Sequence, residues 1–285
     1  MSLRLMTNAD IAAGMRLKEL AGWNQTVADW ERFLVASPEG CFVAEADGRV
    51  CGTVTTIIYE DRFAWIGMVL VDPEYRGRGI GTLLLEKAIE YLDRLKAPAI
   101  KLDATPQGKP LYTKLGFVAE YEIERWVLKR PLENPSTPPT LDRGNAAARP
   151  DFEAMMKLDR QVFGADRSTL LGSLDRDAPE FTLAINTNNE LVGYALGRHG
   201  SRADHLGPWI ARDEASARRL LVEFMRRSTR EHIFVDCLKS SPFACGLVRD
   251  KGFEFSRPLT RMYRGANRYP GRPELVAAIV GPEFG

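Results

Sequence analysis

The chain has 285 residues, of which 45% are hydrophobic and 27% are charged, and its formal net charge is +1. This length suits two domains with a core each, and the near-neutral charge gives no electrostatic reason to expect nucleic acid or an anionic membrane as a partner. Since the chain contains no run of 18 apolar residues and no basic, apolar leader at its N-terminus, we expect a cytoplasmic protein without a membrane partner.

The first half of the chain predicts helices and strands in alternation. A short strand at residues 3–6 is followed by a helix that reaches about residue 20. Thr26 and Asp29 have the spacing of a capping box, which predicts that a second helix begins there. Apolar segments then predict three strands, at residues 41–45, 50–58 and 66–71.

A glycine-rich loop, Arg76-Gly-Arg-Gly-Ile-Gly81, follows the strand at 66–71. A helix begins after the loop, at about Thr82. Glycines allow backbone N–H groups to converge on one point, and the helix dipole adds positive potential there. Arg76 and Arg78 add full charges. The geometry suits a phosphate or a pyrophosphate.

The first domain is predicted to end before a proline-rich segment. A strand at 99–103 and a short helix at 110–115 lead to a last strand at 117–128. Four prolines between residues 131 and 139 predict a linker, because proline continues neither a helix nor a strand interior. We therefore expect three parts, a domain at 1–130, a linker at 131–145 and a second domain at 146–285.

The second half repeats the element order of the first. Val50-Cys-Gly52 corresponds to Leu191-Val-Gly193, and Lys114-Leu-Gly-Phe117 corresponds to Lys251-Gly-Phe253. The second half is shorter at the position of the glycine loop, where it reads Trp209-Ile-Ala-Arg-Asp-Glu-Ala215. We expect a duplicate that has lost its phosphate loop, so that the chain has one such site.

The four cysteines and three histidines form no ligand pattern. The cysteines lack C-x-x-C spacing and the histidines are isolated in the sequence. We therefore expect free thiols and no metal site.

The chain resembles the GNAT superfamily of acyl-CoA-dependent N-acyltransferases. Arg76-Gly-Arg-Gly-Ile-Gly81 fits the family motif of Arg or Gln, two residues, Gly, any residue, then Gly or Ala. A second family element, an aromatic-containing helix that ends in Gly-Phe, matches Leu111-Tyr-Thr-Lys-Leu-Gly-Phe117. The whole chain is similar to bacterial two-domain members with a divergent C-terminal domain. The implied fold is α/β (α+β), with two tandem domains, each a mixed, mainly antiparallel sheet flanked by helices.

The resemblance implies an N-acetyltransferase that uses acetyl-CoA as co-substrate. In the family, loop amides hold the pyrophosphate and the preceding strand pairs with the pantetheine arm. Tyr112 matches a tyrosine that protonates the leaving thiolate, and Thr105 stands where an Asn is common. The cofactor-binding residues implied here are Val69, Leu70, Val71, Arg76, Gly77, Arg78, Gly79, Ile80, Gly81, Thr82, Thr105 and Tyr112.

The acceptor and the base are less constrained. Two tryptophans and an asparagine lie in the two-helix region that walls the acceptor site in the family, and two further side chains are candidates for that site. These five acceptor candidates are Trp23, Asn24, Trp30, Tyr59 and Arg167. The base that removes the amine proton is Asp103, Glu60, Asp61 or an ordered water. Each of these side chains also has a structural interpretation, as a core, capping or turn residue.

Two function classes remain open at this point. The first is direct transfer of an acetyl group to a primary amine, with a small-molecule acceptor as the expected partner and Tyr112 as the acid. The second is an acyl-CoA-binding sensor, in which the loop binds the cofactor and no base completes the site. The sequence predicts neither the identity of the acceptor nor the oligomeric state.

Overall fold

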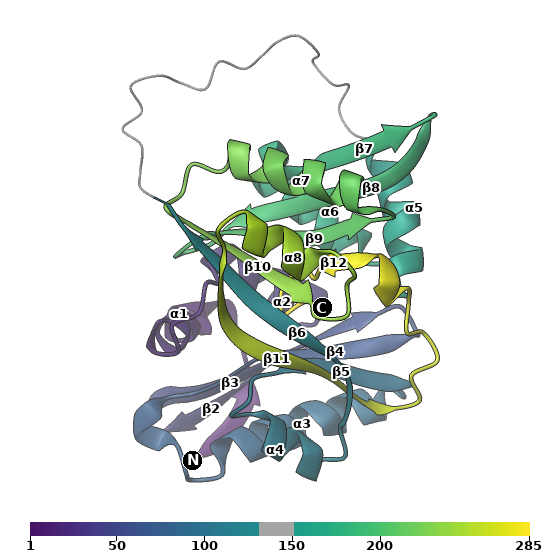
Figure 1. Ribbon diagram of the computed structural model, residues 1–285. Helices are drawn as coiled ribbons and strands as arrows, with labels where there is room; N and C mark the ends of the chain where they lie inside the picture. The colour runs from purple at the N-terminus through teal and green to yellow at the C-terminus, as the bar shows by residue number, and fades with distance from the viewer. Residues whose placement is uncertain (131–150) are drawn as a thin grey trace.

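A computed structural model describes residues 1–130 and 151–285. Within these residues twelve strands form one sheet, in the order β1-β2-β3-β4-β5-β11-β6-β10-β12-β9-β8-β7 (Figure 1). Adjacent strands are antiparallel except for β4 with β5 and β10 with β9, which are parallel. The linker predicted at 131–145 lies outside the described residues.

The elements of the first half follow the predicted order. The capping box at Thr26 is formed, and its backbone N–H donates to the Asp29 carboxylate at 2.8 Å. The elements are β1 (Ser2–Leu5), α1 (Ile11–Leu20), α2 (Val27–Ala36), β2 (Phe42–Ala46), β3 (Arg49–Tyr59), β4 (Phe63–Val71), α3 (Ile80–Arg94), β5 (Ala99–Ala104), α4 (Lys109–Lys114) and β6 (Val118–Lys129).

From its first helix onward the second half has the same order of elements, with one short strand added near its end, and no strand of the described residues corresponds to β1. Its elements are α5 (Phe152–Phe163), α6 (Ser168–Asp177), β7 (Leu183–Thr187), β8 (Glu190–His199), β9 (Asp204–Ala211), α7 (Glu214–Arg227), β10 (His232–Leu238), α8 (Ala244–Asp250), β11 (Glu254–Gly265) and β12 (Val276–Ala278). The two family-like halves predicted from the sequence, each with a mainly antiparallel sheet flanked by helices, are therefore present.

The two halves differ before the helix that follows β4 in the first half and β9 in the second. In the first half a glycine loop separates β4 from α3, whereas only Arg212 and Asp213 separate β9 from α7. The Asp213 carboxylate caps α7 and accepts from the Ser216 N–H at 2.8 Å. Because a carboxylate of the chain already satisfies this helix N-terminus, the second half has no open phosphate cradle here.

The last strands of the two halves are exchanged. β11 lies between β5 and β6, and β6 in turn pairs with β10. Both neighbours of β11 therefore belong to the first half, and both neighbours of β6 belong to the second. Figure 1 shows these two long strands side by side across the middle of the molecule.

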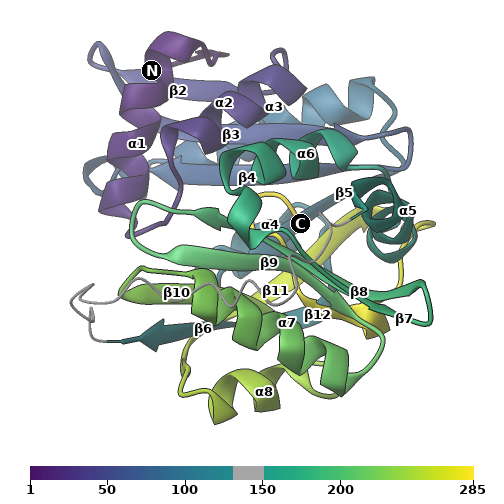
Figure 2. The same cartoon turned by 90° about the horizontal axis from the view of Figure 1, so that it is seen from above.

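Helices cover the sheet on both faces, and one core spans the two halves. α3 packs on one face of β2, β3 and β4, while α1 and α2 pack on the other. The core under α1 and α2 is continuous with the core under α5 and α6 and includes Trp30, Phe33, Leu171 and Leu174 (Figure 2). Across the described ranges, no helix is both long enough and apolar enough to cross a bilayer.

The final segment, residues 281–285, is buried in the middle of the molecule (Figures 1 and 2). The Tyr59 hydroxyl donates to the Phe284 carbonyl at 2.7 Å, and the Trp65 indole donates to the Pro282 carbonyl at 3.1 Å. These contacts hold the segment against β3 and β4 of the first half.

Candidate active site

The sheet opens between the ends of β4 and β5. These parallel strands pair only at Ala64 with Ile100 and at Trp65 with Lys101. Met68 has a positive φ of 51°, close to the point where the register of β4 with β3 shifts. Such a bulge bends a strand away from its neighbour. The β5 side of Val69–Val71 is therefore left without a partner strand, and its backbone groups are available to an extended ligand.

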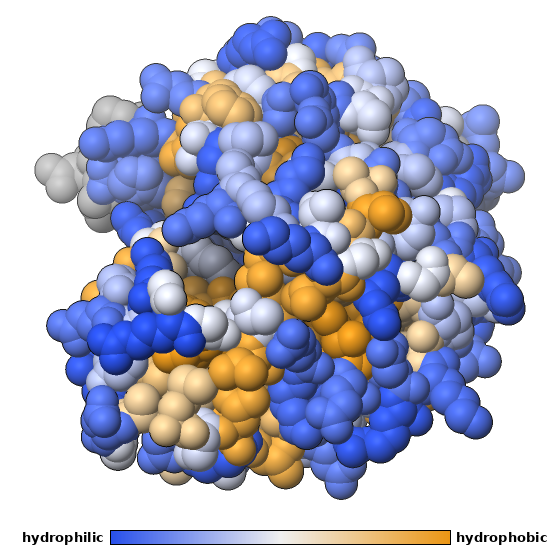
Figure 3. All heavy atoms as spheres, turned by 90° about the horizontal axis from the view of Figure 1, so that it is seen from below, coloured by the Kyte–Doolittle hydropathy of each residue, from blue (hydrophilic) through white to orange (hydrophobic). Residues whose placement is uncertain are grey.

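A cavity of about 810 Å³ occupies this opening. β4, the glycine loop and the segment that leads into α4 form its walls. Its far end is formed by the α1–α2 connection, by β6 and β11, and by residues 282 and 283. Figure 3 shows the hollow left of its centre, bordered by apolar and polar side chains. Both halves of the chain thus contribute to one cavity.

The glycine loop presents open backbone to this cavity. Gly77 and Gly79 have φ angles of 75° and 79°, and a Cβ added to either would meet no atom within 4 Å. Arg76 lines the cavity, and its Nε donates to the Val71 carbonyl at 3.2 Å. Arg78 instead folds over the Tyr75 ring, 5.0 Å from its centroid, and does not line the cavity. The remaining predicted loop residues line it, namely Ile80, Gly81 and Thr82.

Tyr112 and Thr105 face the cavity from the α4 side. The Tyr112 ring lies against Gly108, since a Cβ there would be 2.9 Å from the ring. Burial raises the pKa of Tyr112 to about 12, so the phenol keeps its proton at neutral pH. Its hydroxyl makes no hydrogen bond with any residue of the described ranges. The Thr105 hydroxyl accepts from the Gly108 N–H at 3.2 Å, which leaves its own proton to donate.

Asp103 lines the cavity, but an arginine of the exchanged strand holds both of its oxygens. Arg261 donates to them at 2.8 Å from Nε and at 2.8 Å from Nη2. Asp236, at the corresponding position in the second half, receives Arg125 in the same way, at 2.8 and 2.6 Å. Each exchanged strand is thus fixed by one buried bidentate ion pair. This arrangement favours a structural role for Asp103 over that of a base.

Of the predicted acceptor residues, Trp23 lines the cavity and the other four do not. Asn24 holds the turn between β8 and β9, since its Oδ1 accepts from the N–H groups of residues 202 and 203 at 2.9 and 3.0 Å. Trp30 is fully buried in the shared core. Tyr59 is buried and donates to the Phe284 carbonyl, as described above.

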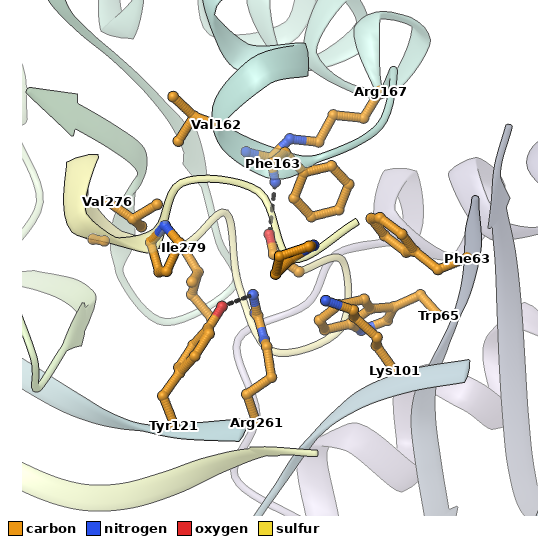
Figure 4. Close-up of a pocket in the computed structure, with 14 residues that line it drawn as sticks. Phe63, Trp65, Lys101, Tyr121, Val162, Phe163, Arg167, Arg261, Val276 and Ile279 are labelled. Atoms are coloured by element: carbon orange, nitrogen blue, oxygen red, sulfur yellow. Dashed lines mark hydrogen bonds between the residues drawn. The ribbon is translucent and has the colours of Figure 1, made fainter. Parts of the chain in front are cut away.

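Arg167 lies at a different place, beside a small internal cavity (Figure 4). Its guanidinium donates to both oxygens of Asp159, at 2.9 and 2.8 Å, and to the Gly285 carbonyl at 2.8 Å. All of its contacts are therefore interior ones. Glu60, a candidate base, accepts from Arg160 at 2.6 Å and from the Asp166 N–H at 3.0 Å.

Four polar residues at the far end of the cavity have no motif in the sequence. They are Gln25, Arg125, Arg257 and Glu283. Gln25, Arg125 and Arg257 lie in predicted helices, strands or connections, and nothing in the spacing of their neighbours marks them as functional. Glu283 had a weak signal, because Gly281-Pro-Glu-Phe-Gly285 places a carboxylate among turn residues outside the repeated elements.

Both halves of the chain match sequence models of one family. Residues 15–117 match the acetyltransferase (GNAT) family, and residues 155–277 match an acetyltransferase (GNAT) domain. Together the two matches extend over more than half of the chain.

Similar proteins of comparable length carry related names. The chain is 24% identical to holothin acyltransferase of a Pseudoalteromonas species, over 92% of this chain and 87% of that protein. It is 28% identical to the uncharacterized N-acetyltransferase YitH of Bacillus subtilis, over 69% of this chain and 68% of that protein. A crystal structure from Pyrococcus horikoshii, described as that of an acetyltransferase, superposes with a TM-score of 0.80 at 22% identity, over 100% of this chain and 95% of that one. This last likeness shows a shared fold.

Proposed function

This chain belongs to the GNAT acetyltransferase family, and on that premise we propose that it transfers an acetyl group from acetyl-CoA to a primary amine. The observation that carries the proposal is the single cavity that joins the open edge of β4, the glycine loop and Tyr112. We infer further that the acceptor is a small molecule, because the acceptor end of this cavity is enclosed by both halves.

The residues present fit the pantetheine and pyrophosphate of acetyl-CoA. Next to the backbone of Gly77 and Gly79 there is open space, which a side chain at either position would occupy. The N-terminus of α3 directs its free N–H groups toward this open space. Arg76 adds a positive charge at the cavity wall. The backbone of Val69–Val71 offers hydrogen bonds to the amides of an extended arm. When bound, acetyl-CoA supplies the activated acyl group.

In the proposed mechanism the neutral acceptor amine attacks the thioester carbon directly, so that a C–N bond forms, the C–S bond breaks and the amine proton passes to an ordered water. The N–H groups on the open edge of Val69–Val71 stabilise the negative charge that develops on the carbonyl oxygen. Tyr112 gives its proton to the sulfur that leaves, and its high pKa keeps that proton in place until then. We also propose that 1–130 is the catalytic domain, 131–145 a linker and 146–285 a divergent domain, which the two separate family matches support.

The test is a thiol-release assay with acetyl-CoA and a mixed pool of amines. An acetyltransferase releases CoA in proportion to amine, above the rate without amine. A sensor binds acetyl-CoA in calorimetry and releases no thiol with any member of the pool. The second outcome would replace the proposed activity with binding alone.

We predict that Gly79→Val raises KM for acetyl-CoA about tenfold or more. The valine side chain enters the open space beside the loop, and a left-handed backbone costs an L-residue about 1–2 kcal/mol. The measurement is KM for acetyl-CoA at saturating amine. Gly48→Val is the matched control, because Gly48 also has a positive φ, of 72°, and open space at its Cβ, but it lies in the β2–β3 turn outside the cavity. Equal effects of the two changes would contradict a phosphate site at Gly79.

A further inference from the structure

Two arginines lie directly opposite each other on the exchanged strands. Arg257 of β11 pairs in register with Arg125 of β6, and both line the cavity. Like charges at directly opposite positions of a sheet destabilise it. Arg125 has a counter-ion, because Asp236 on the next strand, β10, takes its guanidinium in a bidentate pair.

Arg257 has no such counter-ion. No acidic group of the described ranges lies within 4.0 Å of its guanidinium, and its buried Nε has no hydrogen-bond partner. Burial lowers the pKa of Arg257 and the adjacent Arg125 lowers it further, while the more distant Asp236 and Glu283 only partly offset this. A partly buried cation that faces another cation is unfavourable in the protein alone. Because Arg257 lies on a cavity wall, an anionic group of a bound ligand could supply the counter-ion that the protein does not.

The opposite charge at this end of the cavity comes from Glu283. Its side chain is 2% exposed, and its Oε1 accepts from Arg198. Its Oε2 is buried and has no hydrogen-bond partner in the described residues. Glu283 lies against β4 where the sheet begins to open, since a Cβ on Gly67 would be 2.6 Å from the Glu283 carbonyl oxygen. The Glu283 backbone therefore lies beside β4 at the wall of the cavity, and its Oε2 lies next to Gly281, 2.9 Å from where a Cβ on that glycine would be.

Glu283 and Arg257 line the same cavity without pairing with each other, because no ion pair within 4.0 Å joins them. Each has an unsatisfied atom, one an acceptor and the other a donor. The matching ligand carries a donor at one end and an anion at the other. Resting on the proposed function, we propose that the acceptor is an amine that also bears an anionic group, with Glu283 binding the amine and Arg257 the anion.

The experiment compares amines that differ only in the anion. The probes are β-alanine with β-alaninamide, 4-aminobutyrate with its amide, and 2-aminoethyl phosphate with ethanolamine, each with acetyl-CoA and the full chain. We expect the anionic member of at least one pair to have a kcat/KM about 10- to 100-fold higher, as for a hydrogen bond to a charged group. The pair with the largest ratio identifies the anion as a carboxylate or a phosphate.

Two variants test which residue binds the amine of the acceptor and which binds its anionic group. Arg257→Gln is expected to abolish the preference, because it lowers kcat/KM for the anionic member far more than for the neutral member and brings their ratio close to one. Glu283→Gln, which keeps the size of the side chain, is expected to lower kcat/KM for both members. Arg264→Gln is the matched control, since Arg264 is also on β11 but pairs with Asp93 at the surface, away from the cavity. It should change neither value.

The outcomes separate this inference from the proposed function. Equal kcat/KM for the two members of every pair would overturn the inference and leave the acetyltransferase activity standing. A rise in KM for acetyl-CoA in Arg257→Gln, with acceptor KM unchanged, would assign Arg257 to a phosphate of the cofactor and would also overturn it. If no amine releases CoA, the proposed function fails. The inference is then judged by calorimetry with β-alanine and 2-aminoethyl phosphate in the presence of CoA, where binding that Arg257→Gln abolishes supports it and absence of such binding overturns it.

Discussion

Tyr112→Phe is expected to lower kcat about 100-fold or more, with KM for acetyl-CoA changed by less than twofold. The loss is that of a positioned proton donor, whose usual contribution is about 10² or greater. The free energy of unfolding should change little, because the Tyr112 hydroxyl has no hydrogen-bond partner in the described ranges and the ring packing on Gly108 is retained. The measurement is steady-state thiol release at saturating acetyl-CoA.

Tyr75→Phe provides the control for this change. Tyr75 also lines the cavity, but its hydroxyl reaches the surface residue Asp47 at 3.4 Å. We expect its kcat to stay within twofold of wild type. Because burial raises the pKa of Tyr112 to about 12, the wild-type rate should show no loss from phenol ionisation between pH 7 and pH 10. A Tyr112→Phe rate equal to that of wild type would reject the role of this residue as the acid.

Asp236→Ala is expected to lower the free energy of unfolding by about 3–5 kcal/mol, the usual cost of breaking a buried ion pair from one side. The change leaves Arg125 buried without its carboxylate and removes the contact of Asp236 with His205, at 3.1 Å. The two strands that this ion pair joins are β6 of the first half and β10 of the second half. Urea unfolding, monitored by circular dichroism, measures the difference.

The stabilisation by Asp236 depends on pH with a defined sign. Burial alone would raise the pKa of Asp236, but the Arg125 guanidinium and His205 lower it overall, well below its ordinary value. A carboxyl group whose pKa is lowered by folding stabilises the folded state at any pH above its unfolded pKa of about 3.9. This stabilisation is lost progressively as the pH falls below that value. The difference in the free energy of unfolding between wild type and Asp236→Ala should therefore be constant from pH 7 to pH 5 and decrease below pH 4.

An exposed ion pair on the same strand gives the comparison. Glu122 of β6 receives Lys239 at 2.6 Å, and their side chains are 54% and 57% exposed. Glu122→Ala should lower the free energy of unfolding far less than Asp236→Ala does, because solvent screens the pair. A cost for Asp236→Ala as small as that for Glu122→Ala would show that the buried pair does not stabilise the exchanged strands.

Local signals in the sequence predicted the elements and one end of the cavity. Apolar periodicity, the capping box at Thr26 and the glycine loop each depend on residues close together in the chain, and the corresponding elements are present. The strand, loop and helix that would hold acetyl-CoA are likewise consecutive, from Val69 to Thr82. These features need no knowledge of distant partners.

The exchange of β6 and β11 could not be predicted in this way. A strand's alternation of side chains indicates which face is buried but does not name its neighbour. The same limit applies to Asp103, whose partner Arg261 is more than 150 positions away. It also applies to Arg257 and Glu283, which reach the cavity from separate segments of the second half. The acceptor end is assembled by tertiary structure.

The exchanged strands also constrain the order of events during synthesis on the ribosome. β5 ends at Ala104, and its neighbour β11 begins at Glu254. At about 5–20 residues per second, roughly 150 further residues take about 8–30 s to emerge. Throughout that interval the nascent first half exposes the edge of β5 and has no partner for β6, and such edges pair readily with other chains. We therefore expect the first half to require protection, for example by a chaperone, until the second half is complete.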